Sequence, residues 1–367
     1  MRLARRRFDS SPGHSACRCV CWPLAAHRRT RASPYAGFAP AVSETPGCFR
    51  GARAEPRLPS LSCRTVVALL RGRIWPRDRT GLGTYRAVTT TKNLRAEGSE
   101  VDISRALDVL EETATVLDRA VSELPPRRWL RPTPARGWSI ANQIGHLAWS
   151  DSMALQAVQR DPEFAQFVKR VLSSEVSGFV DRGARERATL PVPQLLREWR
   201  AGRSELRDAL AVADPAARVT WLGPPVLPRT MVASRTVETW AHALDVFDAL
   251  AEDMPATAGV QVVAAMGVRT RESSFRARKI PLPEAPVRVE LTVDGGGRIA
   301  FGQADAPERV LGSAWGFAAV VTQRRNIADV ELETVGDGAA RWMRIAQAFG
   351  GAPTNGPTPG ARLAWHQ

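Results

Sequence analysis

The chain has 367 residues, enough for two domains with a sizeable core, and a formal net charge of +14. Residues 1–100 hold 19 of the 51 Lys and Arg residues but only 6 of the 37 Asp and Glu residues, so residues 101–367 are close to neutral. This distribution argues against a basic globular body, and nucleic acid is not an expected partner of it.

Residues 1–100 are expected to be a disordered basic extension, or the product of a start codon assigned too early. All five cysteines lie within the first 63 residues, so residues 101–367 have no thiol nucleophile and no disulfide. No apolar stretch has the length of a membrane span, and no membrane partner is expected. We therefore expect a cytoplasmic protein whose fold begins near residue 101.

Four amphipathic helices are predicted for residues 101–253, with a shorter helix near 162–175 between the second and third. The first, at 103–124, repeats apolar residues at spacings of four and three, which gives one stripe suited to a helical bundle. Ser139 is a plausible N-cap of the second helix, at 140–158. The third and fourth helices are expected at 193–212 and 230–251. These patterns predict an all-α bundle.

A smaller α+β domain is predicted for residues 256–350. A helical stretch at 257–276 precedes an alternating apolar pattern at 287–293 that is typical of a strand. After a glycine turn, the sequence predicts a return strand at 299–301, a helix at 307–325, a strand at 329–335 and a helix at 338–349. Residues 351–367 are expected to form a tail.

Two of the three histidines in the body, His146 and His242, lie within predicted bundle helices. Glu238 precedes His242 by one helical turn, so the two side chains share a face. Side chains from facing helices of a bundle converge inward, and a set of two His and one Glu leaves a position open, as in catalytic zinc sites. A Glu-x-x-x-His pair is also common on helices without a metal, so the spacing alone leaves both readings open.

Two segments resemble the metal-binding motifs of a known family. Residues 137–149 read GWSIANQIGHLAW and residues 238–246 read ETWAHALDV. These segments resemble those of the mycothiol-dependent maleylpyruvate isomerase N-terminal domain, which belongs to a DinB-like group of metal-binding four-helix bundles. The resemblance implies that His146, Glu238 and His242 bind a divalent metal. Zinc is the expected ion, and nickel, cobalt and iron are alternatives.

Two further segments, WLGPP at 221–225 and VTQRR at 321–325, resemble a subfamily described only as metal-binding. Its C-terminal region resembles the domain associated with wyosine base formation. The second half of this chain thus differs from the C-terminal domain expected of the isomerase itself. The resemblance therefore supports the predicted fold and metal site more strongly than it supports the isomerase reaction.

Four other residues are candidates for supporting roles. Asp245 follows His242 by three residues and is expected to orient its ring, and Asp151 is a weaker candidate for the same role towards His146. Arg324 and Arg325 are candidate ligands of a carboxylate or phosphate on a cofactor. For each of the four, a solvated surface side chain is the ordinary alternative.

The favoured function is catalysis by a metal-activated thiolate. Because the body lacks cysteine, the thiol must be exogenous, and the resemblance implies mycothiol, the low-molecular-weight thiol of actinobacteria. The partners would then be this thiol and an electrophilic small molecule, in an isomerisation or an S-transfer. The first alternative is a metal- or ligand-binding module without turnover. The second is a nucleic-acid binder that uses the basic residues 1–100.

Overall fold

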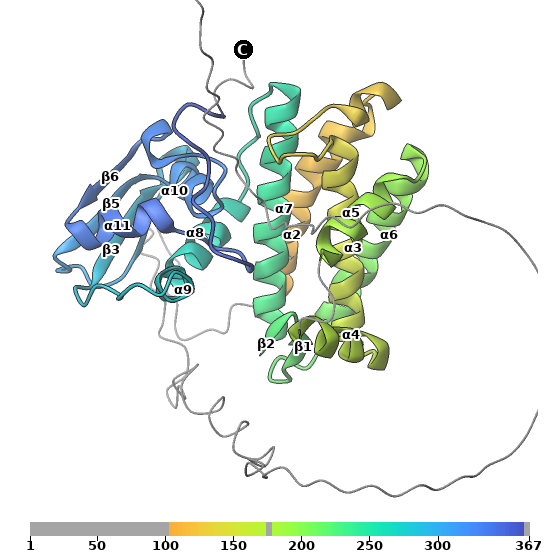
Figure 1. The fold of residues 1–367 in the computed structure, drawn as a ribbon, viewed down its shortest axis with the longest axis horizontal. Coiled ribbons are helices and arrows are strands. Elements are labelled where there is room, and N and C mark those ends of the chain that lie inside the picture. The colour runs from red at the N-terminus through yellow and green to blue at the C-terminus, as the bar shows by residue number, and fades with distance from the viewer. Residues whose placement is uncertain (1–102, 174–177, 363–367) are drawn as a thin grey trace, which may run out of the picture. The chain divides into compact units, whose positions relative to one another are not determined.

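The computed structural model describes residues 103–173 and 178–362 as a helical part followed by a smaller part that contains a sheet (Figure 1). The expected extension at 1–100 lies outside the described residues. The elements of the helical part are α2 (Ile103–Ser122), η1 (Pro126–Leu130), α3 (Ile140–Val158), α4 (Pro162–Leu172), α5 (Phe179–Ala188), α6 (Val192–Ala211), β1 (Val219–Trp221), β2 (Gly223–Val226) and α7 (Pro228–Leu250).

Helices α2, α3, α6 and α7 match the four predicted bundle helices to within about two residues at each end. Helix α2 contacts α6 and α7, and α3 contacts the same two helices. The apolar stripe of α2 is buried, as its spacing predicts, and includes Leu107, Leu117 and Val121. The finer prediction of a DinB-like four-helix bundle stays a prediction.

Helix α3 begins at a position that its sequence specifies. Gly137 has a φ of +76°, which a residue without a Cβ adopts at little cost. Ser139 then caps the helix, because its hydroxyl accepts from the backbone N–H of Asn142 while the Asn142 side chain accepts from the Ser139 N–H. This reciprocal cap fixes the residue at which α3 begins, and therefore the turn of the helix on which His146 lies.

Helix α5 lies in an Arg-rich stretch between the expected helices at 162–175 and 193–212, where no helix was predicted. Its residues pack closely on α3 through two glycines. A Cβ on Gly145 would lie 2.6 Å from the carbonyl oxygen of Ala184, and a Cβ on Gly183 would lie 2.5 Å from the ring of Trp149. Because its contact surface is small residues rather than an apolar stripe, periodicity gave no signal for this helix.

Helix α7 is buried nearly all round, from Arg235 to Leu250. It contacts α2 and α3 on the bundle side and α8 of the second part. Such a helix lacks a polar face, so its charged side chains need partners inside the protein. Within residues 103–173 and 178–362, no helix is both long and apolar enough to span a membrane.

The second part contains a four-stranded mixed sheet with the strand order β4-β3-β5-β6. Strands β3 and β5 are parallel, and the other neighbours are antiparallel. The core includes Val289, Leu291, Val310, Phe317 and Trp342. The elements are α8 (Gly259–Arg269), α9 (Arg271–Ala277), β3 (Val287–Thr292), η2 (Asp294–Gly296), β4 (Arg298–Phe301), β5 (Glu308–Ser313), α10 (Ala314–Val321), η3 (Ile327–Asp329), β6 (Leu332–Val335) and α11 (Asp337–Ile345).

The expected helix at 307–325 is wrong over its first half. Residues Glu308–Ser313 form β5 between β3 and β6, and α10 begins only at Ala314, where Ser313 caps it. A short apolar run next to a helix does not reveal its pairing with a distant strand. Between the expected third and fourth helices, where no strand was predicted, β1 and β2 form an antiparallel hairpin.

The segment after residue 350, which the sequence predicted as part of a tail, is anchored at Arg362. The guanidinium of this residue is buried and donates to Asp245 and Asp248 of α7. Arg278 and Gln323 contact the backbone of the same segment at Thr354. A Pro/Gly-rich composition predicts irregular backbone, but the buried ion pairs of Arg362 and these hydrogen bonds hold the segment in place.

The close contact of α3 with α5 gives a test. Gly145→Ala is expected to lower the free energy of unfolding by about 1–3 kcal/mol, because the new methyl group meets rigid backbone. Gly202→Ala on α6 is the matched control: a Cβ there meets nothing within 4 Å. That change should raise stability by about 0.5–1 kcal/mol. Urea unfolding of both variants checks this, and equal effects would contradict the close packing.

Candidate metal centre

Three side chains from two helices converge at one point. His146 comes from α3, and Glu238 and His242 come from adjacent turns of α7. The Nε2 atom of His146 lies 3.3 Å from Oε2 of Glu238, and Nε2 of His242 lies 3.4 Å from the same oxygen. One ligand atom from each residue lies within 4.8 Å of the others. The structure thus brings together the three residues proposed as metal ligands from the sequence.

The electrostatics of this cluster suit a cation. Burial, and then the neighbouring His242, lower the pKa of His146 to about 4, so its ring is neutral at pH 7. Burial alone would raise the pKa of Glu238, but the neighbouring His146 and His242 rings hold it well below its usual range. A buried carboxylate with a neutral imidazole beside it presents one negative charge and available lone pairs. The donor set therefore fits a divalent ion of the zinc type.

Two tryptophans pack on the histidines. The Trp138 ring stacks on His242 with a centroid distance of 5.9 Å and lies 5.4 Å from the ring of His146. Its Nε1 donates to Asp181 of α5. The Trp149 ring lies 6.1 Å from the ring of His146. These rings shield the imidazoles from water, whereas the Glu238 side chain keeps 27% of its surface exposed.

The acceptor for His242 is Gln143, a residue that sequence reasoning missed in this role. Its Oε1 lies 2.5 Å from Nδ1 of His242. Asp245, the expected partner, instead accepts from Arg324 and Arg362. Asp151, the weaker candidate, accepts from Arg235 of α7. Gln143 stands three residues before His146 in the GWSIANQIGHLAW segment, so its place in the motif was the available signal.

A buried cluster of two carboxylates and three guanidinium groups lies next to the centre along α7. Arg324 pairs with Asp245, Arg325 pairs with Asp248 through two hydrogen bonds, and Arg362 contacts both carboxylates. All five residues are nearly inaccessible to solvent. The predicted roles of Arg324 and Arg325 as cofactor ligands stay untested, and the structure gives each a carboxylate partner within the protein.

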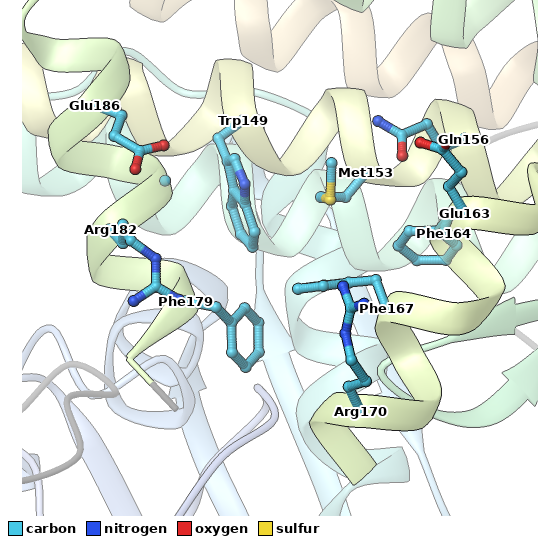
Figure 2. Close-up of a pocket in the computed structure, with 11 residues that line it drawn as sticks. Trp149, Met153, Gln156, Glu163, Phe164, Phe167, Arg170, Phe179, Arg182 and Glu186 are labelled. Atoms are coloured by element: carbon cyan, nitrogen blue, oxygen red, sulfur yellow. The ribbon is translucent and has the colours of Figure 1, made fainter. Parts of the chain in front are cut away.

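A pocket of about 300 Å³ opens beside Trp149, between α3, α4 and α5 (Figure 2). Trp149 and Met153 lie at its centre, with Phe179 and Phe167 at either side and the guanidinium-bearing Arg182 and Arg170 near them. Trp149 both lines the pocket and contacts His146. The pocket and the three-residue cluster are therefore separated by one aromatic ring. The remaining lining residues are Gln156, Glu163, Phe164, Gly183 and Glu186.

All three clustered residues lie within a segment that matches a known family. Residues 110–247 match the family described as mycothiol maleylpyruvate isomerase N-terminal domain. Two relatives come from Mycobacterium tuberculosis, uncharacterized protein Rv0036c of strain H37Rv and uncharacterized protein MT0041 of strain CDC 1551. Each is 42% identical over 240 residues, which cover 65% of this chain and 93% of the relative.

Two solved structures are also similar. They are a mycothiol-dependent maleylpyruvate isomerase and a histidine-to-alanine variant of it, each with 17% identity and a TM-score of 0.43. Each match covers 63% of this chain and 92% of the other.

The buried cluster gives a prediction about acid stability. Burial raises the pKa of Asp245, but Arg324 and Arg362 outweigh it and lower the pKa from 3.8 to about 2. A lowered carboxyl pKa contributes stability that is present above about pH 4 and is lost as the pH falls through about 2. Asp245→Asn should cost about 3–5 kcal/mol at neutral pH, because it leaves buried guanidinium charge uncompensated.

The difference in unfolding free energy between wild type and Asp245→Asn should therefore narrow between about pH 4 and pH 2. Urea unfolding at several pH values measures it. The exposed Asp253 supplies the control, and Asp253→Asn should follow the wild type throughout. A difference that stays constant with pH would contradict the assigned pairing.

The histidine cluster gives a second pH prediction. In the metal-free protein, the His146 ring should titrate near pH 4 and not at its ordinary 6.5. Between these values the unfolded chain binds a proton that the folded protein does not, so this residue lowers stability as the pH falls from 6.5 towards 4. Histidine ring-proton NMR shifts against pH measure the midpoint. A midpoint near 6.5 would show that the ring is solvated.

Proposed function

This chain belongs to the mycothiol maleylpyruvate isomerase N-terminal domain family, and on that premise we propose that it is a metal-dependent, thiol-using enzyme. Its substrate would be an electrophilic small molecule, and its reaction an isomerisation through a thiol adduct or a transfer of the thiol. The observation that carries the proposal is the convergence of His146, Glu238 and His242 on one point.

The three side chains would hold the ion, with His146 and His242 as neutral nitrogen donors and Glu238 as the charged oxygen donor. A divalent cation with an open position lowers the pKa of a bound thiol and so supplies a thiolate near neutral pH. The partly exposed Glu238 leaves the cluster accessible to a small molecule. Trp138 and Trp149 limit water on the imidazole side, which strengthens electrostatic interactions there.

The thiol must come from outside the domain. Residues 101–367 contain no cysteine, so the body has no sulfur nucleophile of its own. The family description names mycothiol, and a thiol of that kind is the proposed co-substrate. The pocket beside Trp149 could bind the second substrate. Its aromatic rings suit the apolar part of a small molecule, and Arg170 and Arg182 suit a carboxylate on it.

Cobalt substitution of the purified full chain tests the proposal. The wild type should bind about one equivalent of Co²⁺, and adding a thiol should produce a sulfur-to-cobalt charge-transfer absorption. Glu238→Gln should lose the stoichiometric ion, because a neutral amide is a much poorer ligand than a carboxylate. Glu205→Gln, the same change at an exposed position on α6, should behave as wild type.

Turnover is measured next, with mycothiol and maleylpyruvate or another electrophile. Thiol-dependent product formation that is lost in Glu238→Gln supports the enzyme. Cobalt binding with no charge-transfer band and no turnover would instead favour a metal-binding module. A wild type that binds no more cobalt than Glu238→Gln would overturn the proposal.

A further inference from the structure

The loop between η1 and α3 brings the hydroxyl group of Thr133 next to Gln143, the residue that contacts His242. Pro132 and Ser139 form an isolated antiparallel bridge, and the backbone N–H of Thr133 donates to the carbonyl of Trp138 at 2.8 Å. The loop thereby closes on itself and points the Thr133 side chain at α3. Thr133 is 3% exposed, so protein groups and not bulk solvent must satisfy its hydroxyl.

A line of hydrogen bonds runs from this loop to His242. The Thr133 hydroxyl donates to the Trp138 carbonyl at 3.0 Å, and Nε2 of Gln143 donates to the Thr133 hydroxyl at 2.8 Å. The other end of the Gln143 amide, Oε1, faces Nδ1 of His242. Gln143 is fully buried and His242 nearly so, so each bond in the line lies away from solvent.

The direction of each bond follows from the one before it. A carbonyl oxygen only accepts, so the single proton of the Thr133 hydroxyl points to Trp138. That hydroxyl then accepts from the Gln143 amide nitrogen, which turns the Gln143 oxygen towards the imidazole. An acceptor at this place requires a proton on Nδ1 of His242, which leaves the lone pair on Nε2.

We propose that Thr133 and Gln143 are positioning residues that hold His242 in the Nδ1–H tautomer, with Nε2 ready for a metal. The metal role rests on the function proposed above, but the tautomer does not. In the metal-free protein, Glu238 favours the other tautomer of His242. Its Oε2 lies 3.4 Å from Nε2 of His242 and would attract a proton to that nitrogen. The oriented amide offsets that attraction before any ion arrives.

His146 serves as an internal reference. Among the residues that the structure describes, no hydrogen-bond partner contacts its buried Nδ1. Its Nε2 faces the same Glu238 oxygen at 3.3 Å. Both imidazoles therefore face the Glu238 carboxylate, but only His242 has the Gln143 amide at its Nδ1. A substitution of Thr133 should therefore change the tautomer of His242 and leave that of His146 unchanged.

Long-range ¹H–¹⁵N NMR of the histidine rings in the metal-free full chain tests the tautomer directly. Wild type and Thr133→Ser, which keeps the hydroxyl, should show His242 as the Nδ1–H form. Thr133→Val removes the hydroxyl at similar size, so the Gln143 amide can reverse and the Nε2–H form should become populated. An unchanged His242 spectrum in Thr133→Val would overturn the proposal, as would an Nε2–H form in the wild type.

Zinc titration gives a second readout. Thr133→Val should bind Zn²⁺ about 10–100-fold more weakly than wild type, as expected when the support behind a histidine ligand is lost, and Thr133→Ser should recover the affinity. Equal affinities in wild type and Thr133→Val would count against the positioning role. If the wild type binds no zinc, the proposed function fails, while the NMR result still decides the tautomer.

Circular dichroism and thermal unfolding show whether Thr133→Val is folded. If it is not, Gln143→Met takes its place, because it keeps the side-chain length and removes the acceptor. It should populate the Nε2–H form of His242 while the His146 signals stay in place. An Nδ1–H form that persists without the Gln143 oxygen would overturn the proposal.

Discussion

Helix α7 is buried on nearly every side, and the position of the candidate metal centre depends on this burial. A helix without a solvent face can carry charged side chains only if each finds a partner inside the protein, because an unpaired buried charge costs several kcal/mol. Arg235 pairs with Asp151 of α3, and Asp245 and Asp248 share three guanidinium groups. These partners fix the position of α7, and with it Glu238 and His242.

The same pairs connect the candidate metal centre to the second part of the chain. Arg324 and Arg325 follow α10, and Arg362 lies near the end of the described residues, yet all three contact the turn of α7 that follows His242. The α+β part therefore helps to hold the helix that supplies two of the three clustered side chains, Glu238 and His242. The buried charge cluster lies about one helical turn from His242.

Local patterns in the sequence predicted much of this arrangement, and distant pairing explains what they missed. Apolar spacing located α2, α3, α6 and α7, and Glu238 with His242 followed from helical geometry. The partner of His242 did not, because i+3 spacing favours Asp245, whereas the facing helix supplies Gln143. Helix α5, strand β5 and the burial of Arg362 depend on contacts far along the chain, which a single sequence does not display.

X-ray absorption at the zinc edge of the zinc-loaded full chain shows whether His146, Glu238 and His242 bind the metal. We expect one zinc at this centre with two imidazole nitrogens at about 2.0–2.1 Å, at least one carboxylate oxygen, and no sulfur until a thiol is added. Addition of the thiol should then introduce one sulfur at about 2.3 Å. A first shell with fewer than two imidazoles would contradict a centre built from His146, Glu238 and His242.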